Sequence, residues 1–166
     1  MSPPFLLLYT MALNGLKKIM EDLEAFNFEV SLSSIIAENK DLISDKVADQ
    51  IGRTGLDGNG DRITLDGGEY TDFTVRYKQE HGKGLGAVTD RVTLYQTGEL
   101  YRMIETEVTI DEVTTLSNVP YYDELMERTG EQVMKLNESS RLEFAQEIVI
   151  PAFAEDLKEK TGLKIN

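Results

Sequence analysis

The feature that most restricts how this chain can fold is the uneven distribution of its glycines. Ten of the thirteen glycines lie between Gly52 and Gly98, and helical patterns dominate the residues on either side. Glycine costs backbone entropy in regular elements and readily adopts turn conformations. We therefore expect a glycine-rich loop or arm at about residues 52–91, inside a single domain that spans residues 1–166.

Amphipathic helices are predicted before this segment. Apolar residues recur at three- and four-residue intervals from Ala12 to about Phe26, which indicates a helix with one buried face. A second helical pattern begins at Ser33 or Ser34, either of which is a suitable N-cap, and runs to Ile51. Between them, residues 28–32 alternate in polarity and could form a short strand or an extended connection.

The segment from Val88 to Met103 is predicted to organise the rest of the chain. Alternation around Val92 suits a short extended piece with one buried face. Thr97 and Gly98 then break the pattern, because the Thr97 hydroxyl can cap a turn and Gly98 can take a positive φ. One helical turn would follow at Glu99–Met103 if the Thr97 cap forms, but local physics alone favours the alternative of a simple strand, turn and strand. We interpret Thr97 and Gly98 as a hinge of the fold.

The second half of the chain alternates strand and helix signals. A hairpin is predicted from Ile104–Ile110 and Val113–Leu116, and a short helix should run from about Val119 to Glu127 or Arg128. A final helix begins at Asn137 or Ser139, and Pro151 should kink or split it. The order of elements predicts an α+β fold, in which N-terminal helices and a C-terminal helix pack on a small, mostly antiparallel sheet.

The acidic composition limits the partners that the chain can have. Its formal net charge is −13 and its pI is about 4.5, so most of its surface should repel nucleic acid. There is no cysteine, which excludes disulfides and thiolate metal sites. The apolar run Phe5–Tyr9 is far shorter than the roughly 20 residues of a membrane span. Either Met11 is the natural start and residues 1–11 are an extension, or this run docks on a partner.

Three motifs suggest chemistry, and none of them is complete. Residues 57–61 resemble the start of a calcium-binding EF-hand loop, but Arg62 and Gly68 replace its glycine and its bidentate glutamate. Residues 82–86 lack the spacing of a phosphate-binding loop. His81 is the only candidate general base, and nothing fixes a nucleophile beside it. We expect a protein that is not an enzyme, with no catalytic residue, no bound metal and no cofactor.

The central segment also combines aromatic and basic residues. Phe73, Val75 and Tyr77 alternate with polar residues, which favours a strand, although a short helix is possible. Three glycines between His81 and Gly86 predict a flexible stretch that a partner would order. We interpret the mixture of aromatic and basic side chains as a subunit-interface patch. Its residues are Tyr70, Phe73, Arg76, Tyr77, Lys78, Lys83 and Arg91.

Several short motifs, taken in order, resemble one family. Leu94, Thr97, Gly98 and Leu100 follow a basic, glycine-bearing loop, as in the virion-morphogenesis, neck and tail-completion proteins of tailed bacteriophages. The likeness extends roughly from Ser33 to Leu157. Its other elements are the acidic turn after the second helix (50–62), Lys78 followed by Gly82-Lys83-Gly84, the Pro-Tyr element at 118–122, the helix end at Gly130, and the segment 136–140. The usual serine after the Thr-Gly turn is replaced, since Met103-Ile104 stand there.

The resemblance implies a structural virion protein. Such a subunit would be assembled in the bacterial host cytoplasm and would form a homo-oligomeric ring at the head–tail junction. Its partners would be copies of itself and neighbouring phage connector or tail proteins. DNA would pass nearby without sequence-specific binding, and no membrane would be involved. The alternative is a small prophage-encoded protein-binding module or regulator that is not a virion component.

Overall fold

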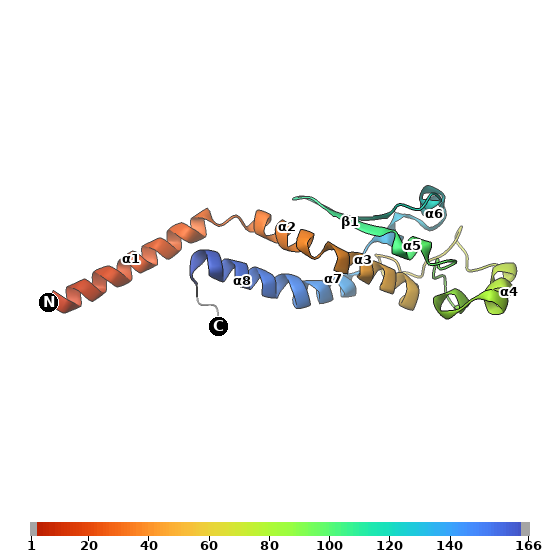
Figure 1. The fold of residues 1–166 in the computed structure, drawn as a ribbon, viewed down its shortest axis with the longest axis horizontal. Helices are drawn as coiled ribbons and strands as arrows, with labels where there is room; N and C mark the ends of the chain where they lie inside the picture. The colour runs from red at the N-terminus through yellow and green to blue at the C-terminus, as the bar shows by residue number, and fades with distance from the viewer. Residues whose placement is uncertain (1–2, 164–166) are drawn as a thin grey trace.

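The computed structural model describes residues 3–163, with side-chain surroundings given from residue 14 onward. The molecule is elongated (Figure 1). Helix α1 (Pro3–Ala25) extends away from the body, and α4 (Asp72–His81) lies at the opposite end. The predicted extension (residues 1–11) and the predicted helix that begins at Ala12 are therefore parts of one continuous helix, which the structure describes from Pro3 onward.

Two consecutive helices follow α1. Helix α2 (Phe28–Glu38) begins after Asn27, whose side chain accepts a hydrogen bond from the Val30 amide. Helix α3 (Lys40–Asp49) continues after a break at Asn39 and runs into a π-helical turn, η1 (Gln50–Thr54). The prediction of an extended piece at residues 28–32 was wrong. The Asn27 cap begins the helix there, earlier than either predicted serine cap.

The predicted hairpin is confirmed. Strands β1 (Ile104–Val108) and β2 (Val113–Ser117) pair antiparallel, with Ile104 opposite Ser117 and Val108 opposite Val113. Helix α3 packs on β1, and the Ser44 and Thr106 hydroxyls are 2.8 Å apart across this contact. Helix α3 therefore covers the face of the hairpin that carries the buried residues Ile104 and Thr106.

The C-terminal half returns along the N-terminal helices. After α6 (Tyr122–Thr129) and η3 (Glu131–Met134), Asn137 caps α7 (Glu138–Phe144). A π-helical turn, η4 (Ala145–Val149), separates α7 from α8 (Ile150–Thr161), so the helix is interrupted just before Pro151, as predicted. Helix α8 packs mainly along α2 instead of against the sheet (Figure 1).

One apolar core joins segments that are distant in the sequence. It contains seven buried side chains: Val47, Ile51, Ile63, Val92, Ile104, Val133 and Met134. The buried amide of Gln50 ties two further segments together. Its Nε2 donates to the carbonyls of Leu56 and Lys135, and its Oε1 accepts from the Asn137 amide at 2.9 Å. The fold is α+β, in agreement with the prediction.

The glycine-rich segment departs most from expectation. Residues 72–81 form helix α4, so the preferred strand at Phe73–Tyr77 was wrong, and a short 3₁₀ helix, η2 (Gly84–Ala87), follows. The Thr71 hydroxyl accepts from the Thr74 amide and caps α4. The stretch from His81 to Gly86, expected to be ordered only by a partner, packs against its own molecule, with Gly86 buried. The buried Lys78 side chain holds this stretch in place, because its ammonium group donates to the Gly86 carbonyl.

Residues 88–103 follow the prediction in part. Val92 and Thr93 are both buried, and Leu94 has a positive φ of 53°. This piece therefore neither alternates nor stays extended through Leu94, and it pairs with no strand among residues 3–163. The turn at Thr97-Gly98 is confirmed, because the Thr97 hydroxyl accepts from the Glu99 amide at 3.3 Å and Gly98 has φ 78°. Helix α5 (Glu99–Arg102) is the helical turn that the Thr97 cap allowed, so the favoured strand after this turn was wrong.

Candidate functional site

Lys78, which belongs to the predicted subunit-interface patch, is buried inside the protomer. Its side chain is only 7% exposed. Its ammonium group donates to the Tyr95 carbonyl at 3.0 Å and to the Gly86 carbonyl at 3.5 Å, and it lies 4.6 Å from the centre of the Tyr70 ring. These contacts fold the glycine-rich stretch back onto α4, because the buried charge gathers carbonyl oxygens around itself.

Three tyrosines complete this cluster. The Tyr70 hydroxyl accepts from the Thr93 amide at 3.0 Å, and the Tyr101 hydroxyl donates to the Thr93 carbonyl. The Tyr95 and Tyr101 rings meet edge to face at 5.3 Å. Burial raises the pKa of Tyr101 well above its ordinary value, and the nearby Tyr70 and Tyr95 raise it further. The three tyrosines and Lys78 therefore form a hydrogen-bonded support for the chain before the Thr97-Gly98 turn.

Arg91 also serves an internal role in part. Its guanidinium group pairs with Asp90 at 2.9 Å, while its Nε is buried without a hydrogen-bond partner among the described residues. Tyr70, Lys78 and Arg91 thus belong to the protomer's own packing. They are not available together as a contact surface, contrary to what their sequence pattern suggested.

The other four residues of the predicted patch are exposed. Phe73 and Tyr77 lie one turn apart on α4, with 78% and 50% of their surfaces exposed. The Tyr77 ring is 4.9 Å from the ring of His81, which continues the same helix face, and Arg76 and Lys83 lie exposed nearby. Exposed large aromatic side chains on one helix face are typical of contact surfaces.

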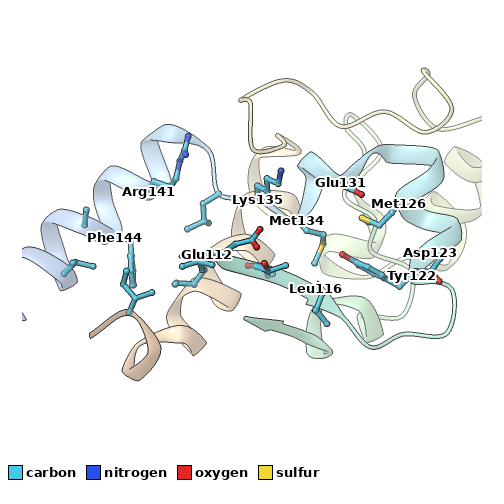
Figure 2. Close-up of a pocket in the computed structure, with 18 residues that line it drawn as sticks. Glu112, Leu116, Tyr122, Asp123, Met126, Glu131, Met134, Lys135, Arg141 and Phe144 are labelled. Atoms are coloured by element: carbon cyan, nitrogen blue, oxygen red, sulfur yellow. The ribbon is translucent and has the colours of Figure 1, made fainter. Parts of the chain in front are cut away.

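A second candidate surface is an apolar groove on the body (Figure 2). It has a volume of about 780 Å³ and lies between α2, α3, strand β2, α6, η3 and α7. Its floor is made by Ile43, Met134 and Phe144, which are buried, and Met126 and Leu116 line its wall. This volume lies in the range that is typical of binding pockets in proteins. The flexible side chains of Met126 and Met134 can adapt to the shape of a bound side chain.

The rim of the groove is charged, and the charges are ordered. Figure 2 shows Arg141 at the α7 end and Glu131 and Asp123 toward the α6 end, with Lys135 and Glu112 close together between them. All five are exposed. Near the acidic end the pKa of Tyr122 is raised, first by burial and then by Glu131 and Asp123. The groove therefore favours a partner whose cationic and anionic groups follow the opposite order.

The motifs considered for chemistry have structural roles. In the EF-hand-like turn, the Asp57 carboxylate accepts from the amides of Asn59 and Asp61, at 2.8 and 3.0 Å. The predicted turn is confirmed, and that carboxylate is engaged by backbone. His81 is exposed, with Glu80 3.8 Å away. No group of three or more histidine or acidic residues with metal-site geometry occurs in the described part of the chain.

Comparisons with known proteins add no relative. The chain matches no protein-family model, no curated protein and no solved structure. Within residues 3–163, no helix is long and apolar enough to cross a membrane. The function of this chain is therefore inferred from its own residues and their arrangement.

The predicted patch contains three exposed residues of α4, Phe73, Arg76 and Tyr77, but no prediction from the sequence pointed to the groove. The neighbours of Phe144 in the groove come from α2, β2, α6 and η3. No local pattern marks a cavity whose walls are distant in sequence. The only available signal was an excess of apolar residues on short helices, such as Met126 on α6.

Proposed function

We propose that this protein is a structural subunit of a tailed-phage virion, a neck or tail-completion component that assembles as a ring at the head–tail junction. The observation that carries the proposal is the ordered series of motifs from Ser33 to Leu157, centred on the Thr97-Gly98 turn. The series resembles the virion-morphogenesis and neck proteins in both order and spacing.

The geometry of the protomer is consistent with this role. A helix projects from one end of the elongated body, and an exposed aromatic and basic helix face lies at the other (Figure 1). A subunit with different contact surfaces at two separated positions can join copies head to tail, and such contacts close into rings when the rotation permits. A net charge of −13 would repel passing DNA and keep it from adhering to the channel.

The mass of the assembly and its place in the virion test the proposal. Light scattering after size exclusion should give a ring of several subunits, either for the chain alone or with the proteins encoded beside it. An antibody against the chain should label the head–tail junction in micrographs of purified virions. A persistent monomer that joins no particle would contradict the proposal and favour the prophage-encoded binding module.

A further inference from the structure

We propose that the apolar groove is filled by α1 of a second copy of this chain. The inference rests on the proposed ring, and it names the contact that joins neighbouring subunits. It starts from two surfaces of one protomer that lack a partner within the described structure: the outward face of α1 and the groove between α6 and α7.

The first surface is the exposed side of α1. Leu16 and Met20, four residues apart and hence on one helix face, are each 61% exposed. Helix α1 has contacts with α8 near the body, but most of its length extends beyond it (Figure 1). An isolated helix of this kind has little stability of its own in water, because helices in proteins depend on packing of an apolar face. A surface that covers Leu16 and Met20 would therefore stabilise it.

The second surface accommodates a helix of this chemistry. The groove is apolar along its floor and open to one side, and Met126 and Met134 supply flexible contacts. Amphipathic helices commonly bind by placing anchors at i and i+4 into such grooves. Leu16 and Met20 have that spacing.

Charge order selects α1 as the occupant and fixes its direction. Along α1, Lys17 and Lys18 precede Glu21, Asp22 and Glu24. Along the groove, the acidic residues Asp123 and Glu131 lie toward the α6 end and Arg141 lies at the α7 end, with Lys135 and Glu112 between these ends (Figure 2).

With Leu16 toward α6 and Met20 toward α7, Lys17 lies toward Asp123 and Glu131, and Glu24 lies toward Arg141. Lys18 lies on the opposite side of α1 from Leu16, because residues two apart do not share a helix face. From Lys17 to Glu24 the helix advances about 10 Å, at about 1.5 Å per residue, which separates the two blocks. Complementary charges of this kind set register and exclude the reversed orientation.

A second copy, not the same copy, is the occupant that the arrangement favours. Only Phe26 and Asn27 separate α1 from α2, and the Phe26 ring packs edge to face on Phe153 of α8 at 5.9 Å. Helix α1 extends from there away from α6 and α7, whose residues line the groove (Figure 1). Since the donor helix and the acceptor groove are different surfaces, the contact is head to tail and can propagate around a ring.

Cysteine cross-linking tests the contact directly, because the native chain contains no cysteine. We would mix Leu16→Cys chains with Asp123→Cys chains under mild oxidation. Both positions are exposed in the protomer, so neither change disturbs the core. A disulfide-linked dimer should form in the mixture and in neither variant alone. The pair Leu16→Cys and Leu142→Cys is the control, because Leu142 is exposed on α7 outside the groove.

Other linkages would overturn the inference. Cross-linking of Leu16→Cys alone would mean that two α1 helices pair with each other. A disulfide within one chain carrying both Leu16→Cys and Asp123→Cys would mean that the helix covers its own groove. Absence of any link in an assembled ring would mean that another surface joins the subunits.

A charge exchange supplies a second test that needs no new bond. Lys17→Glu with Lys18→Glu should weaken association about tenfold or more, and Asp123→Lys with Glu131→Lys in the same chain should restore it. Light scattering would measure both. If all these variants form rings like those of the native chain, the groove contact is wrong while the ring proposal stands. If the native chain never assembles, even with neighbouring virion proteins, the ring proposal itself is wrong and this contact falls with it.

Discussion

The Lys78 ammonium group donates a hydrogen bond to the Tyr95 carbonyl at 3.0 Å, which joins α4 to the chain just before the Thr97-Gly98 turn. Together with the contact to the Gly86 carbonyl, this bond organises the glycine-rich segment around a lysine of its own chain. The lysine that sequence reasoning placed on a subunit interface is therefore part of the protomer's internal support.

Replacing this lysine should destabilise the protomer. Lys78→Met keeps much of the side-chain volume but leaves the Tyr95 and Gly86 carbonyls without their charged donor. Unfolding in urea should show a loss of about 2–3 kcal/mol. Lys83→Met is the matched control, because Lys83 is exposed five residues further along, and it should change stability by less than about 0.5 kcal/mol. Equal stability of the two variants would refute the internal role of Lys78.

The close approach of backbone at Gly82 gives a second prediction. A Cβ atom at this position would collide with the carbonyl oxygens of Lys78 and Gly86. Gly82→Ala should therefore cost about 1–3 kcal/mol or more, because backbone must shift to admit it. At Gly68 an added Cβ would lie 3.8 Å from the Leu65 carbonyl, in ordinary contact. Gly68→Ala should be nearly neutral in the same denaturation experiment, and a similar loss in both variants would contradict the explanation.

Alkaline pH should expose the role of Tyr101. Burial raises the pKa of this tyrosine in the folded state above its ordinary value of 10.0. Above that pH the unfolded chain releases the proton while the folded chain retains it, so the free energy of unfolding falls as pH rises. Tyr101→Phe should lose about 1 kcal/mol near neutral pH, through the missing bond to the Thr93 carbonyl, and should show a shallower alkaline decline.

Urea titrations at several pH values would measure this difference. Tyr77→Phe, which removes an exposed phenol from α4, serves as the control and should follow the native curve. An unchanged alkaline slope in Tyr101→Phe would show that another group causes the decline.

Acid should weaken the contact between α2 and α8. The Ser31 hydroxyl donates to Asp156 at 2.6 Å, and Lys160 bonds the same carboxylate at 2.9 Å. Both lower the pKa of Asp156 below its ordinary value of 3.8, and the Ser31 hydrogen bond is the largest single cause. The associated stability is present above that ordinary value and is lost as pH falls toward the folded-state pKa.

Ser31→Ala should therefore reduce the acid-dependent part of this stability. The difference between native and variant urea midpoints should be largest above about pH 5 and should shrink toward about pH 3. Ser34→Ala, on an exposed position of the same helix, is the control. A difference that stays constant with pH would mean that Ser31 acts by packing alone.

Much of the fold could be predicted because its signals are local. The hairpin, α6, the Asn137 cap, the interruption before Pro151 and the Thr97-Gly98 turn all depend on residues within a few positions of one another. Alternation, capping side chains and the restricted geometry of proline and glycine act over that range. The α+β class follows from the order of these elements.

The glycine-rich segment could not be predicted in this way. Alternation at Phe73, Val75 and Tyr77 favoured a strand, but the Thr71 cap and the burial of Lys78 stabilise a helix there. A lysine is usually exposed, and its burial depends on the carbonyls of Gly86 and Tyr95, which only the folded chain brings to it.

The sequence by itself determined the hairpin, α6, the Asn137 cap and the acidic charge, because each arises from neighbouring residues or from composition. Only the tertiary structure decided which side chains are available for contact. It placed Lys78 inside, left Phe73 and Leu16 outside, and formed a groove from Ile43, Met126 and Phe144. Exposure and cavities depend on which distant segments pack together, and no local pattern records that packing.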